Sequence, residues 1–312
     1  MTGVNGKVHS RFMQSAIREY KMRKWLYLMV IPGVIIIFLF SYVPMYGILI
    51  AFKSYKVKLG IMGSPWVGLK YFQSFFANPL ATRTIRNTLL LGTYNLAWSF
   101  PAPILLALLF NELRNERFKK LVQTVSYYPN FVSTVIIVGM LPSFCAADGL
   151  FNGIRGAFGL PAANFMSDAR YFRTLFIASG IWQGVGFGTI IYLAALSGVD
   201  PELYDAADID GAGRLRKIWH INLPHIRPTI IILFIMAIGG MFNADMQKVL
   251  LMYSPSTYEV ADIIATYTYR EGIEGARFEY STAVGLFQTA VNFLFLVSAN
   301  FISRKLSDTS LF

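Results

Sequence analysis

The chain has 312 residues, of which 55% are hydrophobic and only 14% are charged, and its mean hydropathy is +0.49. A soluble protein of this length has a larger charged fraction, so the composition excludes an ordinary soluble domain and indicates a membrane protein. The net charge of +11 does not indicate nucleic-acid binding, because the basic residues are spread over loops that flank apolar segments.

The first 24 residues, 1–24, form a basic segment ahead of the first apolar run, and we expect them to be cytoplasmic. The apolar residues of this segment recur at helical spacing opposite basic ones. The segment therefore either lies along the inner membrane surface or is a basic tail that only sets orientation. The apolar run that follows is too long for a cleavable signal peptide and lacks a small-residue cleavage site.

Six segments are apolar over the roughly 20 residues that a transmembrane helix needs. They are Trp25–Ile50, Leu89–Phe110, Val122–Phe144, Leu175–Leu196, Pro228–Met241 and Ala283–Ile302. The fifth is short if it ends at Met241, so we expect it to continue past Asn243. The sequence predicts an all-α, polytopic membrane protein with six transmembrane helices, a transmembrane domain over 25–303 and a cytoplasmic tail over 304–312.

The distribution of Lys and Arg predicts the orientation of these helices. Four regions on one side of a six-helix topology are basic: the N-terminal segment, the loop after the second apolar segment, the loop over 200–227 and the tail. Both termini and the loop 200–227 are therefore expected in the cytoplasm. The first external loop departs from the rule, since it holds Lys53, Lys56, Lys58, Lys70, Arg83 and Arg86.

The loop 200–227 contains the stretch DAADIDGAGRLRKIWHINLP, a charged sequence between two apolar segments. The stretch predicts a short amphipathic helix from Asp205 to Ile209. Gly211 then permits a bend that a residue with a Cβ atom would resist. Pro224 and Pro228 are expected to open the next helix, because proline is tolerated at a helix start.

The spacing in this loop resembles the EAA loop of permease subunits from binding-protein-dependent ABC importers. The family's usual glutamate is Asp205 here, which keeps the charge but is shorter by one methylene group. The resemblance implies a type I ABC importer permease fold in a bacterial cytoplasmic membrane. It also implies that this loop couples the chain to an ATPase through a set of residues: Asp205, Ala206, Ala207, Asp210, Gly211, Ala212, Ile221, Leu223 and Pro224.

Other segments resemble permeases of carbohydrate importers, including alginate-type importers. These are GSPWVGLKYFQSFF (Gly63–Phe76), ALLFNEL (Ala107–Leu113), SYYPNFVSTVIIVG (Ser126–Gly139), YEVADIIATYTYREG (Tyr258–Gly272) and STAVGLFQTAVNFLFLVSAN (Ser281–Asn300). The resemblance implies that the cargo is an oligosaccharide. The basic first external loop would suit an acidic, alginate-like oligomer; the alternative is that its lysines bind lipid head groups or the solute-binding protein.

The sequence contains no G-x-x-x-x-G-K-[ST] phosphate loop, so we expect ATP and Mg²⁺ to be bound by a partner rather than by this chain. The resemblance implies four partners: the lipid bilayer around this chain, a second permease subunit, an ATPase dimer that docks beneath them and an extracytoplasmic solute-binding protein. The rival interpretation is a self-sufficient secondary transporter, which would need a coupling-ion site and usually internal repeats. A membrane-embedded enzyme is a third interpretation, but it lacks a nucleophile or metal constellation.

Polar and aromatic residues within the apolar segments are candidates for the solute pathway, because sugars stack on aromatic faces and intramembrane polar groups tend to face a cavity. They are Tyr94, Asn95, Trp98, Trp182, Gln183, Asn243, Gln288 and Asn292. Hydrogen bonding between helices is the competing explanation for each of them. Cys145 is the only cysteine and the histidines lack metal-ligand spacing, so neither a disulfide nor a metal site is expected.

Overall fold

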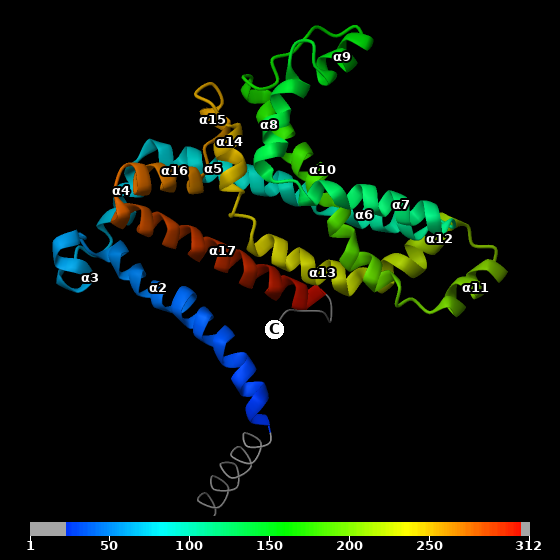
Figure 1. Ribbon diagram of the computed structural model, residues 1–312, viewed down its shortest axis with the longest axis horizontal. Helices are drawn as coiled ribbons and strands as arrows, with labels where there is room; N and C mark the ends of the chain where they lie inside the picture. The colour runs from blue at the N-terminus through cyan, green and yellow to red at the C-terminus, as the bar shows by residue number, and fades with distance from the viewer. Residues whose placement is uncertain (1–22, 307–312) are drawn as a thin grey trace, which may run out of the picture. The chain divides into compact units, whose positions relative to one another are not determined.

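The computed structural model describes residues 23–306 of the chain (Figure 1). These residues are mostly helical, and within them β-pairing is limited to two isolated bridges, Lys53 with Trp66 and Lys56 with Gly60. The chain divides into two compact units, Met1–Gly68 and Leu69–Phe312, which are described separately. The predicted amphipathic segment before Met22 and the end of the predicted tail lie outside the described residues.

The first unit contains one long apolar helical span, Arg23–Phe52, followed by a short loop. The end of the span departs from regular α-helix through the π turn η1 (Phe38–Tyr42), α2 (Val43–Met45) and the 3₁₀ helix η2 (Tyr46–Phe52). The loop holds η3 (Val57–Leu59) and α3 (Gly60–Gly63).

Lys53 is part of the structure of that loop. Its Nζ donates hydrogen bonds to the carbonyl oxygens of Ile61 (2.9 Å) and Met62 (3.1 Å), and it lies 5.9 Å from the ring centroid of Trp66. Lys53 therefore connects the start of the loop to its later residues.

The second unit begins with the second and third spans and the shorter helices that precede them. In chain order they are α4 (Lys70–Ala77), α5 (Pro79–Tyr94), the π turn η4 (Asn95–Ser99), α6 (Pro101–Asn111), α7 (Glu116–Tyr127), the 3₁₀ turn η5 (Tyr128–Phe131), α8 (Thr134–Cys145) and α9 (Leu150–Ala157). The second span thus runs without interruption from Pro79 to Asn111, with a π turn in its middle.

The rest of the unit holds the fourth, fifth and sixth spans and the short helices between them. They are α10 (Ala169–Leu196), α11 (Pro201–Ile209), α12 (Arg214–Lys217), the π turn η6 (Ile218–Asn222), α13 (Leu223–Gly239), α14 (Met246–Met252), α15 (Tyr258–Ala261), α16 (Ile264–Tyr269), the π turn η7 (Arg270–Glu274) and α17 (Phe278–Leu306). Six helical stretches in the described residues are long and apolar enough to span a membrane, which confirms the predicted number.

Several predicted boundaries are wrong: the second span begins at Pro79 rather than Leu89, and the third and fifth spans are displaced for identifiable reasons. The third span begins at Thr134 rather than Val122, because Pro129 lies in the turn after α7 and the Ser133 side chain caps a new helix by accepting from the N–H of Ile136. The fifth span does not continue past Asn243. It ends at Gly239, just before Gly240, and instead extends back to Arg214.

Two pairs of long helices pack along each other in the second unit, α6 with α10 and α13 with α17 (Figure 1). Ile104, Ala107, Tyr192 and Ile226 form a buried apolar cluster where α6, α10 and α13 meet. Close packing of α7 on α10 depends on Gly186, because a Cβ atom there would lie 2.0 Å from the carbonyl oxygen of Ser126.

A buried charged cluster joins α5 to the segment that holds α15 and α16. The Asp262 side chain is fully buried and accepts two hydrogen bonds from Arg270 (2.9 and 2.7 Å), and Arg83 approaches it to 3.5 Å. Asn87 donates to the backbone carbonyls of Glu259 (2.9 Å) and Asp262 (3.1 Å). Paired and hydrogen-bonded in this way, the buried carboxylate holds the end of α5 in place.

Candidate coupling loop and solute cavity

The loop between the fourth and fifth spans forms the helix and bend that its sequence predicts. Asp200 caps α11 by accepting from the N–H of Glu202 (3.0 Å), and Pro201 occupies the first turn. The helix ends in a Schellman turn, in which Ala212 N–H donates to the Ala207 carbonyl (2.8 Å) and Gly211 N–H donates to the Asp208 carbonyl (3.1 Å).

Gly211 adopts a φ of +69° in this turn, which confirms the predicted bend. Residues with a Cβ atom are disfavoured at this backbone angle. An ion pair between Lys217 and Asp208, with Nζ and Oδ1 2.5 Å apart, links α12 back to α11. Backbone geometry and this ion pair together fix the angle between the two short helices.

The prediction that Pro224 and Pro228 open the next helix is confirmed for Pro224, which lies in the first turn of α13, and is wrong for Pro228, which lies inside that helix. The helical stretch begins at Arg214 and continues through both prolines to Gly239. Leu223 separates Pro224 from the π turn η6, whose wider hydrogen-bonding pattern accommodates a nearby residue without an N–H group. Asn222 within this turn is fully buried and accepts a hydrogen bond from the hydroxyl of Tyr204, so α11 is also tied to the base of the fifth span.

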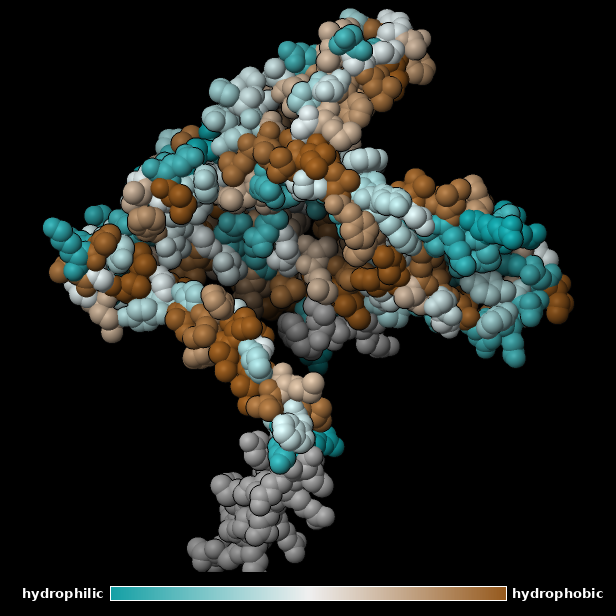
Figure 2. Space-filling view, viewed as in Figure 1, coloured by the Kyte–Doolittle hydropathy of each residue, from teal (hydrophilic) through white to brown (hydrophobic). Residues whose placement is uncertain are grey.

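The surface of this loop combines charge with exposed apolar side chains. Asp205, Ala206, Asp210, Gly211 and Pro224 are exposed, and the other predicted coupling residues, Ala207, Ala212, Ile221 and Leu223, are partly buried. Large apolar side chains beside them are also open to solvent, including Ile209 (88% exposed), Leu215 (73%) and Trp219 (64%). The end of the unit formed by α7, α11 and α12 is otherwise largely hydrophilic (Figure 2).

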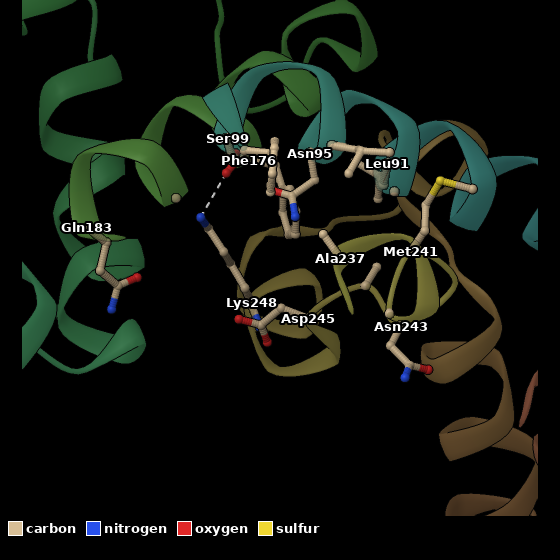
Figure 3. A pocket seen from close by; sticks show the side chains of 16 residues that line it. Leu91, Asn95, Ser99, Phe176, Gln183, Ala237, Met241, Asn243, Asp245 and Lys248 are labelled. Carbon is tan, nitrogen blue, oxygen red and sulfur yellow. Dashed lines mark hydrogen bonds between the residues drawn. The ribbon is translucent and has the colours of Figure 1, made fainter. Parts of the chain in front are cut away.

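A cavity of about 480 Å³ lies among the second span, α10 and the segment after α13 (Figure 3). Polar and apolar side chains from all three elements line it. The polar lining residues are Asn95, Ser99, Gln183, Asn243, Asp245 and Lys248. The break after Gly239 brings the chain against α5 at Gly92, where a Cβ atom would lie 2.0 Å from the Met241 carbonyl oxygen.

Lys248 is the most deeply buried charged residue of the cavity, at 4% exposed. Its Nζ donates a hydrogen bond to the Phe176 carbonyl oxygen (2.8 Å) and lies 4.8 Å from the centroid of the Phe176 ring (Figure 3). Burial lowers the pKa of this amine from 10.5 to about 8, although the charge of Asp245 acts in the opposite direction. With a pKa of about 8 the amine still carries its positive charge at pH 7, so a cation lies at the cavity wall.

Three predicted pathway residues meet in a hydrogen-bonded network beside the cavity. Asn243 Oδ1 accepts from Gln288 Nε2 (3.0 Å) and from Asn292 Nδ2 (2.8 Å), while Asn292 Oδ1 accepts from the Phe242 N–H (3.1 Å). These bonds tie the irregular segment after α13 to α17. Gln288 and Asn292 therefore bond helix α17 to a non-helical segment, a structural role like the competing explanation, although only one of the two partners is a helix.

The other candidates are divided among three places. Asn95 lines the cavity, and Gln183 lines it while donating to the Val132 carbonyl oxygen (3.1 Å). Tyr94 and Trp98 lie apart from them, in a groove with Arg170 and Arg173. Trp182 lines an apolar pocket with α8 and α9.

The sequence reasoning missed Lys248, Asp245 and Ser99 as cavity residues. Lys248 and Asp245 follow the fifth predicted apolar segment, and the sequence does not show that the irregular segment after α13 packs against the second span and α10. One signal was available. Lys248 stands directly before the apolar run VLLM (Val249–Met252), and a lysine beside such a run indicates a buried or functional cation.

Residues 99–308 match the model of the family described as binding-protein-dependent transport system inner membrane component. The match covers most of the chain and includes the coupling loop and most of the cavity. The chain belongs to this family. It is therefore a multi-pass inner membrane permease, a transport component rather than an enzyme, and the secondary-transporter interpretation is set aside.

Relatives of known name are similar to this permease over nearly their whole length. Protein LplB of Bacillus subtilis (strain 168) is 46% identical over 293 residues, which cover 94% of this chain and 92% of LplB. The polygalacturonan/rhamnogalacturonan transport system permease protein YteP of the same organism is 46% identical over 291 residues, covering 93% and 91%.

A solved structure also resembles this permease. A chain of a bacterial ABC transporter involved in the import of the acidic polysaccharide alginate superposes with a TM-score of 0.86 and 37% identity, covering 94% of this chain and 99% of that chain. The type I importer permease fold expected from the sequence is thus confirmed.

Proposed function

We propose that this permease forms part of the membrane pathway of an ATP-driven importer for oligosaccharides, with acidic oligomers as its preferred cargo. The observation that carries the proposal is the similarity, over nearly the full length, to a permease named for polygalacturonan and rhamnogalacturonan transport. The similar alginate importer also handles an acidic polysaccharide. A cavity lined by amides, a hydroxyl and a lysine suits such a solute, because each of these groups can donate hydrogen bonds to sugar oxygens.

The partners in this proposal are a second permease subunit, an ATPase dimer and an extracytoplasmic solute-binding protein. The similar alginate importer has been solved in complex with a periplasmic protein bound to an alginate pentasaccharide. An ATPase dimer that binds ATP and Mg²⁺ would supply energy by docking on the exposed surface around Asp205 and Gly211. Exposed apolar side chains such as Ile209 and Trp219 on an otherwise polar surface are typical of an interface.

Both termini and the loop around Gly211 are cytoplasmic in this proposal, because Lys and Arg flank that side of the spans. Introducing a cysteine at position 211 in a Cys145→Ala background tests the orientation with a membrane-impermeant thiol reagent. We expect no labelling in intact cells and full labelling after permeabilisation. Labelling in intact cells would contradict the orientation.

Uptake in a strain that lacks the gene for this chain tests the cargo. Complementation should restore uptake of a labelled uronate oligomer, with weaker uptake of a neutral oligosaccharide of the same length. Restored uptake of amino acids or peptides, with no sugar transported, would contradict the carbohydrate assignment. Equal uptake of the neutral and acidic oligomers would contradict the acidic preference alone.

A further inference from the structure

Lys248 has fewer partners than a buried ammonium group requires. Its side chain has three N–H donors, yet the described residues provide one hydrogen-bond acceptor, the Phe176 carbonyl oxygen at 2.8 Å. The ion pairs found between described residues do not include Lys248. Since an unpaired buried charge is costly, the two remaining donors are suited to an anion that enters the cavity.

A second polar group of the cavity also lacks a partner. Ser99 Oγ is buried without a hydrogen bond, and Ser99 ends the π turn η4, which places both Asn95 and Ser99 on the cavity wall. Single π turns inside α-helices are frequent at functional sites. The two groups come from the second span and from α14, so two separate elements of the cavity wall offer hydrogen bonds to a ligand.

Asp245 is the other charged residue of the cavity, and it is already engaged. Its Oδ1 accepts from the backbone N–H of Lys248 (3.0 Å) and so caps α14, while the Lys248 side chain extends away to α10 (Figure 3). Gly180 leaves room for that extension, because a Cβ atom there would lie 3.2 Å from Lys248 Nζ. The positive and negative groups of the cavity are therefore held apart.

We propose that Lys248 binds the carboxylate of a uronic acid unit during translocation and thereby sets the preference of this permease for acidic over uncharged sugars. The inference rests on the proposed function as an oligosaccharide permease. The cavity volume of about 480 Å³ lies within the roughly 300–1,000 Å³ of small-molecule sites. The neighbouring Asn95, Ser99 and Gln183 then serve the sugar hydroxyls.

The competing role for Lys248 is structural, since its bond to Phe176 also joins α14 to α10. The variants Lys248→Met and Lys248→Arg separate the two roles. Methionine fills a similar volume without charge, whereas arginine retains the charge and the donors. Copurification of the ATPase with each variant shows whether the complex still assembles.

The experiment measures uptake of a labelled trigalacturonate and of its fully methyl-esterified counterpart in the complemented deletion strain. The binding protein is the same in every strain, so its own selectivity cancels when each variant is compared with the wild type on one sugar. We expect Lys248→Met to raise the half-saturating concentration of trigalacturonate about tenfold or more, because a hydrogen bond to a charged group contributes about 1.5–3 kcal/mol. Uptake of the ester should change less than threefold, and Lys248→Arg should restore most of the acidic uptake.

Asp245→Asn provides a matched control with the opposite expected sign. Asparagine caps a helix as well as aspartate, so α14 is preserved while the negative charge is removed. We expect this variant to favour trigalacturonate over the ester more strongly than the wild type does.

Equal losses on both sugars in Lys248→Met, or no rescue by arginine, would overturn the assignment of Lys248 while leaving the oligosaccharide function intact. A wild-type strain that transports neither sugar would overturn the proposed function and this inference together.

Discussion

The coupling loop and the solute cavity of this permease differ in how they are built. The coupling loop is one continuous stretch of chain, α11 and α12, whose shape follows from a cap at Asp200, a left-handed glycine at Gly211 and one ion pair. The cavity combines residues from the second span, α10 and the segment around α14, which are far apart in sequence. Local chemistry therefore determines the first region, and packing between spans determines the second.

Breaking the packing between spans should have the largest effect. Gly186→Ala places a Cβ atom about 2.0 Å from the Ser126 carbonyl oxygen, so we expect a loss of about 3 kcal/mol or more in stability. Thermal unfolding of the purified permease in detergent measures this effect. Gly184→Ala, in the same helix with no atom within 4 Å, is the matched control. It should be neutral or slightly stabilising, and an equal loss in both variants would contradict the packing account.

Straightening the coupling loop should have the next largest effect. Gly211→Val forces a β-branched residue to a φ of +69°, at a cost of roughly 1–3 kcal/mol. We expect the protein to insert normally, since the loop lies outside the apolar spans, but to lose copurification with the ATPase. Gly213→Val is the control, because Gly213 has an ordinary φ of −68°. Normal assembly of Gly211→Val would show that the bend is not needed for docking.

Reversing the charge at Asp205 should weaken coupling without bending the loop. Its carboxylate is exposed, so Asp205→Lys leaves the fold intact and places a positive charge on the docking surface. We expect about tenfold weaker ATPase association, with a smaller loss for Asp205→Asn. Binding assays at low and high salt check this, because an electrostatic contribution shrinks as salt rises. An unchanged affinity in both variants would remove Asp205 from the interface.

The smallest expected effect is a pH dependence of cargo choice. The Lys248 amine has its pKa lowered to about 8, so it loses its charge as the pH rises from 7 to 9, whereas uronate carboxylates stay ionised. Uptake of trigalacturonate relative to its ester should fall severalfold over this range in proteoliposomes. Unfolding does not explain such a fall. A lysine pKa below its unfolded value of 10.5 makes the folded state more stable as the pH rises from about 8 to 10.5. A constant ratio would contradict the prediction.

The sequence predicts the membrane class, the six spans and the coupling loop because each depends on residues close together in the chain. Composition and span length require a helix, and Gly211 allows one particular turn. The start of α8 at Thr134 depended on a weaker local signal, the cap at Ser133. The break after Gly239 was missed because the apolar pattern continues through it.

The cavity could be predicted only in part. Asn95, Gln183 and Asn243 were selected as polar residues within apolar segments, and all three line it. Tyr94 and Trp98 were selected by the same rule but lie in a different groove, because they occupy another face of the second span. The face of a helix that meets a given neighbour depends on how the spans pack. This packing involves residues far apart in the chain, so the local sequence pattern does not predict it.

The central claim is that the two regions have separable functions: the loop around Gly211 transmits ATP-driven motion and the cavity around Lys248 selects the sugar. ATP hydrolysis by the complete importer in nanodiscs, stimulated by binding protein loaded with trigalacturonate or with its ester, tests this claim most directly. The account predicts that Gly211→Val loses stimulation by both sugars alike, whereas Lys248→Met loses it only with the acidic sugar. Loss of stimulation by both sugars in Lys248→Met, or retained stimulation in Gly211→Val, would contradict it.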